Sequence, residues 1–228
     1  MNNWTAILVP IAAALIGGIA SFLASYVVEK KKWTADAAID RKSNIYAPIY
    51  DELAIIIEMR STEHGRIRRL HKLTLKEWVM CKDRADELIV PKNLVNKLNS
   101  LLEKIELYNE AREDLMEELK NRYTESHVDR YDYGVIFNLA EAQLAGSLDL
   151  DEFYKALVEQ NPTAPDPSLY WSEDRINSEI LLLSNIAEWT KLQEVDNSLG
   201  LALEDAHQDL AKRIARITSR FQKPKRNL

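Results

Sequence analysis

The sequence contains one cysteine, Cys81, and only six glycines and seven prolines among its 228 residues. A single cysteine excludes a disulfide framework and a cysteine-based metal site. The scarcity of glycine and proline removes the turn signals that separate the strands of a β protein, whereas leucine, glutamate, lysine and alanine are abundant. We therefore expect an all-α chain.

The chain also lacks an excess of positive charge. Its formal net charge is −6 and its isoelectric point is about 5.4. Proteins that coat nucleic acids are usually basic throughout their binding domain, so this balance argues against that class. Local basic clusters remain compatible with this overall charge.

Catalytic signatures are missing as well. The four histidines have no zinc-site spacing, and the chain has neither a glycine-rich phosphate loop nor an HExxH motif. Glu204 and His207 form one ExxH pair, but a di-iron carboxylate bundle needs a second ExxH and two further glutamates. We therefore predict that this pair is a solvated helix face. No enzyme activity, no metal and no cofactor are expected.

Charge is absent from the first 28 residues, which are mostly apolar or small from Thr5 onwards. This run is long enough to cross a hydrocarbon core of about 30 Å, and Trp4 and Trp33 bracket it as interfacial anchors. A cleaved signal peptide would carry a positive N-terminal region, which this chain lacks. The pattern predicts a single transmembrane helix with its anchors over residues 1–33. Because Lys30, Lys31 and Lys32 follow the run, the positive-inside rule predicts an external N-terminus and a cytoplasmic remainder.

Small residues form two stripes along this first helix, offset by about 100°. One stripe contains Ala13, Gly17, Ala20 and Ala24, and the other contains Ala14, Gly18, Ser21 and Ser25. Such stripes allow helix backbones to approach closely. A symmetric dimer needs one contact face and a ring needs two, so the pattern favours a homo-oligomer that is a tetramer or a pentamer. The alternative is that alanine and glycine are simply frequent in membrane helices.

The remaining sequence predicts a stalk helix over residues 34–60 and a cytoplasmic α-helical domain over residues 61–228, of bundle type. Pro48 should bend the stalk or mark a helix boundary. Thr74 with Glu77 predicts a capping box, Ser172 predicts a helix N-cap, and the segment Asn197–Gly200 predicts an interruption. A repeat of about 3.5 residues, interrupted by Arg112, predicts one long core-facing helix that contains Leu94, Leu98, Leu101, Ile105, Tyr108, Leu115 and Leu119.

Two basic clusters exclude acidic residues. Their main members are Arg66, Arg68, Arg69 and Lys72 in the first, and Arg213, Arg216 and Arg220 in the second. Both could bind the phosphates of a nucleotide, an oligonucleotide or a lipid headgroup. Alternatively, they pair with the acidic helix from Glu103 to Glu118, or form solvated faces.

Two functions follow from this organisation. The first is a homo-oligomeric membrane effector, in which the first helices form a bundle or pore that a ligand or partner controls through the helical domain. The second is a membrane-tethered scaffold that recruits a protein partner. The layout of the Thr5 to Val28 run, the three lysines and a helical domain resembles the single-pass membrane effectors of bacterial anti-phage defence, including Hailong-type effectors. This resemblance implies an oligomeric, channel-like protein in the inner (cell) membrane of a bacterium, triggered by a nucleotide or oligonucleotide.

Overall fold

The computed structural model describes residues 4–60, 70–125, 150–160 and 171–222, together with short pieces between 135 and 144. All regular elements in these ranges are helices, so the prediction of an all-α chain is confirmed for them. The α-helices are α1 (Trp4–Arg41), α2 (Ala47–Arg60), α3 (Lys76–Asp83), α4 (Lys92–Glu125), α6 (Leu150–Gln160), α7 (Glu173–Ser184) and α8 (Ala187–Phe221). A π-helix, η1 (Lys42–Tyr46), and a 3₁₀ helix, η2 (Asp86–Ile89), complete the order.

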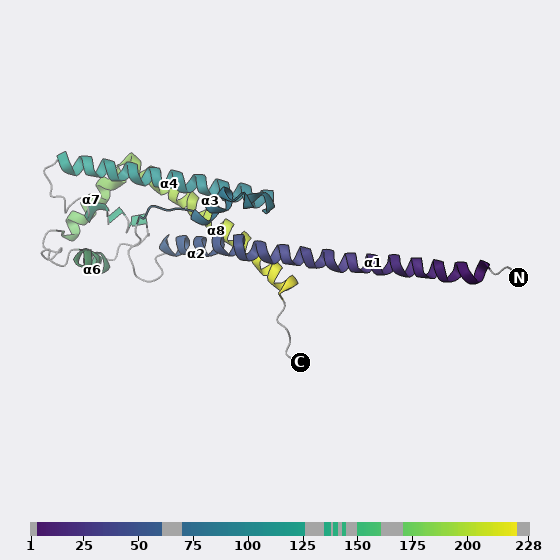
Figure 1. Ribbon diagram of the computed structural model, residues 1–228. Coiled ribbons are helices and arrows are strands. Elements are labelled where there is room, and N and C mark those ends of the chain that lie inside the picture. The colour runs from purple at the N-terminus through teal and green to yellow at the C-terminus, as the bar shows by residue number, and fades with distance from the viewer. Residues whose placement is uncertain are drawn as a thin grey trace.

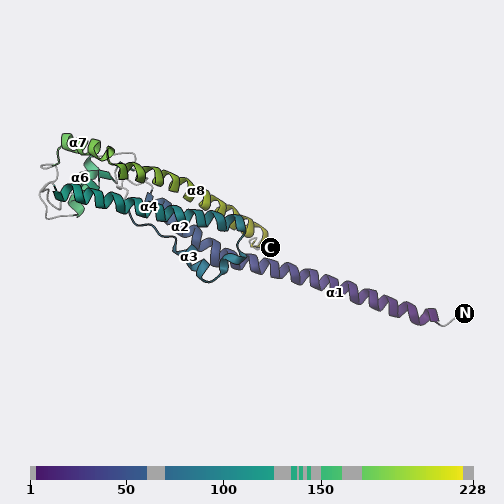
Figure 2. The same cartoon turned by 90° about the horizontal axis from the view of Figure 1, so that it is seen from above.

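Helices α4 and α8 are the longest of the bundle and lie side by side in opposite directions (Figures 1 and 2). The residues that the 3.5-residue repeat assigns to the core of α4 are all buried, which confirms that prediction: Leu94, Leu98, Leu101, Ile105, Tyr108, Leu115 and Leu119. The facing row of α8 is buried too and contains Leu192, Leu199, Leu203, Ala206 and Leu210. Burial of a leucine side chain stabilises a fold by roughly 1.5–3 kcal/mol, so the buried leucines of this seam contribute strongly to stability.

The first three elements form one continuous helical run, α1–η1–α2. Pro48 explains why its middle is a π-helix: proline has no amide hydrogen, and its ring clashes with the carbonyl of the residue four positions earlier, Asn44. The wider π turn from Lys42 to Tyr46 precedes the proline, and the run continues as α2. The chain therefore accommodates Pro48 without ending the helix.

A buried ion pair holds the end of α2 against α8. Arg60 Nη2 lies 2.9 Å from Asp196 Oδ1 and donates a 2.7 Å hydrogen bond to the Asp196 carbonyl oxygen. The guanidinium occupies the space beside Gly200, where an added Cβ would lie 2.9 Å from Arg60 Nη1. The predicted interruption at Asn197–Gly200 is wrong, because α8 continues through it and this glycine makes room for Arg60. The break lies earlier, at Asn185 and Ile186.

Helix α3 is capped by α2 and not by its own sequence. The predicted capping box of Thr74 and Glu77 is wrong, since the N-cap residue is Leu75 and no side chain caps it. Glu52 instead accepts hydrogen bonds from the backbone N–H groups of Lys76, at 2.7 Å, and Glu77, at 3.0 Å. Burial raises the pKa of the Glu52 carboxyl above its usual range.

The predicted cap of α7 is present. The Ser172 side chain accepts a hydrogen bond of 3.3 Å from the backbone N–H of Arg175. This confirms Ser172 as the N-cap of α7. The sequence therefore predicted the start of α7 correctly. Its predictions of a capping box at the start of α3 and of a break within α8 were wrong.

The predicted transmembrane helix over residues 1–33 is wrong, and so is the placement in a bacterial inner membrane that depends on it. In the described part of the chain, no helix combines the length and the apolarity that a membrane span requires.

We predict that Asp196→Ala lowers the free energy of unfolding by about 3–5 kcal/mol, because it leaves the Arg60 charge buried without its carboxylate. Urea denaturation followed by circular dichroism measures this loss. The matched control is Asp205→Ala, which removes an exposed carboxylate that lies 2.8 Å from Lys97 and should cost less than about 1 kcal/mol. Equal losses in the two variants would contradict the assigned role of the buried pair.

A second prediction concerns Cys81, whose side chain is buried in the core. Burial raises the pKa of this thiol from 9.0 to about 11. The folded chain therefore retains a proton between pH 9 and pH 11 that the unfolded chain releases, so stability falls as the pH rises through this window. Urea midpoints should show a larger fall in the parent than in Cys81→Ala. Iodoacetamide should alkylate the folded protein at pH 8 at least about 100-fold more slowly than the unfolded chain, since only the thiolate reacts.

Candidate functional site

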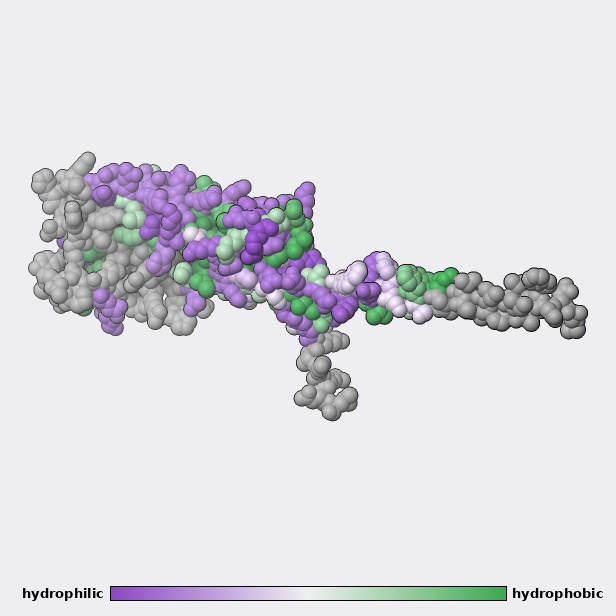
Figure 3. All heavy atoms as spheres, in the orientation of Figure 1, coloured by the Kyte–Doolittle hydropathy of each residue, from purple (hydrophilic) through white to green (hydrophobic). Residues whose placement is uncertain are grey.

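Helix α1 projects away from the bundle as a single helix (Figures 1 and 2). Its apolar side chains are exposed on all sides: Ile19 is 60% exposed, Phe22 70%, Val28 67% and Trp33 63%. Figure 3 shows hydrophobic residues on the visible face of the outer described part of this helix, beyond the hydrophilic stretch that joins it to the body. An apolar surface of this kind marks an interaction site, because water disfavours it.

The predicted oligomerisation stripes lie on this projecting helix. Ser21, Ala24 and Ser25 are exposed. The remaining members lie within α1, but their side chains are outside the described residues: Ala13, Ala14, Gly17, Gly18 and Ala20. The structure contains one chain and therefore no contact between copies. The role of these stripes in self-association stays a prediction.

The structure does not bring Lys72, the described member of the first predicted basic cluster, close to Arg213 of the second. Lys72 lies 3.2 Å from Glu113, in the second half of α4, whereas Arg213 donates to Asn93 at the start of α4. Twenty residues of α-helix separate these two contacts, or about 30 Å. One nucleotide therefore cannot bridge Lys72 and Arg213.

Within each cluster the placement differs from residue to residue. Arg213 Nη2 also lies 3.2 Å from Asp209 Oδ2, so this side chain is already engaged within the protein. Arg216 and Arg220 are exposed on the last turns of α8. Arg66, Arg68 and Arg69 lie outside the described residues. The predicted phosphate-binding role of both clusters remains untested.

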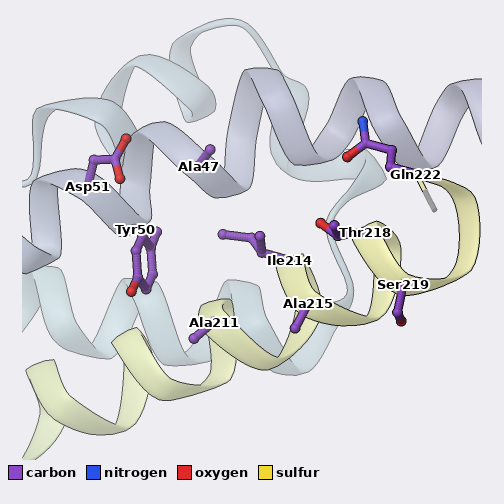
Figure 4. A pocket seen from close by; sticks show the side chains of 9 residues that line it. All are labelled: Ala47, Tyr50, Asp51, Ala211, Ile214, Ala215, Thr218, Ser219 and Gln222. Carbon is purple, nitrogen blue, oxygen red and sulfur yellow. The ribbon is translucent and has the colours of Figure 1, made fainter. Parts of the chain in front are cut away.

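A groove between α2 and α8 hollows the described surface of the bundle. Its volume is about 710 Å³ and its walls consist mostly of apolar or small side chains (Figure 4). Tyr50 and Ile214 project into the space between the two helices. The full lining contains Ala47, Tyr50, Asp51, Ala211, Ile214, Ala215, Thr218, Ser219 and Gln222. Alanines at the point where the two helices cross leave the space that larger side chains would fill.

Two contacts tie the walls of this groove together. The rings of Tyr50 and His207 stack with their centroids 4.1 Å apart and their planes 15° apart. At the other end, Lys42 Nζ donates hydrogen bonds of 2.8 Å to Thr218 Oγ1 and 2.6 Å to Gln222 Oε1. The groove is therefore held open between two fixed points, one on α2 and one on η1.

The ExxH pair is divided between two environments. Glu204 is exposed, as a solvated face requires, but His207 is half-buried against Tyr50 and its Nε2 atom has no hydrogen-bond partner. Among the residues described, no group of three or more histidine, cysteine, aspartate or glutamate side chains is arranged to hold a metal ion. His207 thus contributes to packing beside the groove, whereas Glu204 does not.

Sequence reasoning did not identify the groove. A signal for it exists, because Ala211, Ala215 and Ser219 form a row of small residues four positions apart on α8. This row alone does not identify the helix that packs against it. Its partner, the segment from Ala47 to Asp51, lies about 160 residues earlier in the chain.

Comparisons with protein-family models, with curated proteins and with solved structures give no match for this chain. The geometry of the groove and of the projecting helix is therefore the basis for the functional argument.

We predict that Lys42→Met loosens the last turns of α8 without unfolding the bundle. Loss of two hydrogen bonds, each worth about 0.5–1.5 kcal/mol net, should raise amide hydrogen exchange around Thr218 and Gln222 by roughly 5- to 100-fold. Exchange in α4 should not change, and Lys212→Met, an exposed lysine on the same helix, serves as the control. Identical exchange at Thr218 in the parent and in Lys42→Met would show that the Lys42 hydrogen bonds do not stabilise the last turns of α8.

Proposed function

We propose that the protein is a non-catalytic, self-assembling scaffold. Copies associate through the projecting helix α1, and the helical bundle recruits a protein partner. This retains two elements predicted from the sequence, homo-oligomerisation and partner recruitment, and leaves out the membrane.

The observation that carries the proposal is the exposure of large apolar side chains around α1. The core of the bundle is closed without them, because among the described side chains of α1 only Ala38, near its end, is buried. A helix that is apolar all round requires cover. Identical helices from other copies supply that cover, since each presents the same apolar surface.

Two different faces of α1 support a ring over a pair. Ile19, Phe22 and Tyr26 are large and follow one another at helical spacing, whereas Ser21, Ala24 and Ser25 are small. Large side chains of one helix pack into the space that small side chains of the next leave open. Such a head-to-tail contact uses two different faces and closes into a ring when the rotation between copies permits.

The test is analytical ultracentrifugation of the full chain. We expect the parent to sediment at four or five times the 26.2 kDa mass of one chain. Phe22→Glu should disrupt the large face and Ala24→Leu should fill the small face, so each variant should shift the protein toward monomers at about 10 μM. The matched control is Leu88→Glu on η2, which alters a leucine that is 82% exposed and should leave the mass unchanged.

The outcomes are distinguishable. An effect of only one of the two variants would indicate a symmetric pair in place of a ring. A parent that is monomeric contradicts self-assembly, and so does a monomeric parent that floats with phosphatidylcholine vesicles, because the cover of α1 would then be lipid.

A further inference from the structure

The floor of the α2–α8 groove suits a helix. The lining residues of α8 run from Ala211 to Gln222, which at 1.5 Å per residue gives a groove about 16 Å long, or three helical turns. Small side chains at Ala47, Ala211 and Ala215 permit close approach of another backbone, and helices pack with their axes about 8–10 Å apart. Both walls are α-helices, whose backbone groups are bonded internally, so the groove offers no edge to which an extended strand could add.

The groove is also preformed. The Tyr50–His207 stack and the hydrogen bonds of Lys42 fix the distance between its walls before anything binds. A rigid site loses little conformational entropy on binding. Such a site favours a complementary partner over a general apolar one.

The two rims of the groove carry opposite charge. On the α2 side, Asp51 is exposed and lines the edge. On the α8 side, Lys212 and Arg216 are exposed and share one helical row with the lining residue Ser219, at spacings of four and three residues. No acidic residue follows Asp209 on this helix. A helix in the groove therefore meets the Asp51 carboxylate along one flank and the Lys212 and Arg216 side chains along the other.

We propose that this groove binds an amphipathic helix of about three turns from a partner protein. That helix has small and medium apolar side chains on its buried face, basic side chains along the flank that meets Asp51, and acidic side chains along the flank that meets Lys212 and Arg216. Paired charges beside an apolar seam set the choice and direction of partner helices, as they do in coiled coils. The inference rests on the recruiting part of the proposed function and defines its site and the chemistry of the partner.

The first experiment uses three synthetic 14-residue peptides that share one apolar face of leucine and alanine. The mixed peptide has lysine on one flank and glutamate on the other, and the two remaining peptides have only lysine or only glutamate. Fluorescence anisotropy with the full chain should show that the mixed peptide binds at least about 10-fold more tightly than either uniform peptide, a difference of about 1.4 kcal/mol. Failure of the mixed peptide to bind at 100 μM, or equal binding of all three, overturns the proposal.

A charge reversal in the protein sharpens this test. Lys212→Glu combined with Arg216→Glu places acidic side chains on both rims, so the all-lysine peptide should become the tightest ligand. An unchanged order of the three peptides means that the rims do not select the partner, and this result overturns the charge assignment.

The floor is tested by Ala215→Trp, which fills the groove from an exposed position and should weaken the mixed peptide at least about 10-fold. Leu107→Trp, at a half-exposed site on α4, is the matched control and should bind as the parent does. Unfolding midpoints show whether both variants remain folded. If Ala215→Trp changes the oligomer mass and leaves peptide binding intact, the groove is an interface between copies and the proposal fails.

These results separate the inference from self-assembly. Phe22→Glu should leave the affinity for the mixed peptide unchanged, because α1 projects beyond the groove. If the chain assembles but binds no peptide, self-assembly through α1 is supported and the groove proposal is wrong. If the chain is monomeric and binds the mixed peptide, the groove proposal is supported and self-assembly is wrong.

Discussion

The antiparallel seam between α4 and α8 is the contact on which the positions of the other helices depend. It is built from leucines spaced for a helix–helix contact, and polar ties along its edges fix the register. Lys97 lies 2.8 Å from Asp205, and Lys191 lies 2.8 Å from Asp114, so the start of α4 faces the end of α8. Once α8 is placed, its second face is available to α2, and α2 in turn caps α3 through Glu52.

The packing of α2 on α8 differs from this seam because polar and aromatic groups fix it at separate points. The Arg60–Asp196 ion pair holds one end, the Tyr50–His207 stack holds the middle, and Lys42 holds the other end. Charged and ring contacts are directional, so they set the spacing of two helices without requiring large side chains between them. Alanines then occupy the space between the last two ties, and the groove is the consequence.

The seam was predictable from the sequence, whereas the groove was not. The repeat from Leu94 to Leu119 is a local pattern whose period determines the buried face. Gly200 shows the limit of such patterns, since a glycine that resembles a helix interruption is required by the size of Arg60, 140 residues away in the chain. The same applies to the cap of α3, because Glu52 replaces the local capping box. Contacts between residues far apart in the sequence determine the cap of α3 and the continuity of α8 at Gly200. Local sequence patterns do not reveal such contacts.

The projecting helix and the groove share one helical run, because α1, η1 and α2 follow one another without a break. Lys42 lies in the π turn between the exposed part of α1 and the wall of the groove, and its ammonium group contacts the last turns of α8. Helices bend most easily at a π turn. Because the Lys42 hydrogen bonds and the Tyr50–His207 stack hold the wall of the groove against α8, a bend on the α1 side of this turn changes the direction of α1 without changing the width of the groove. The arrangement of copies around α1 and the fit of a partner helix are thus separate properties of one helical run.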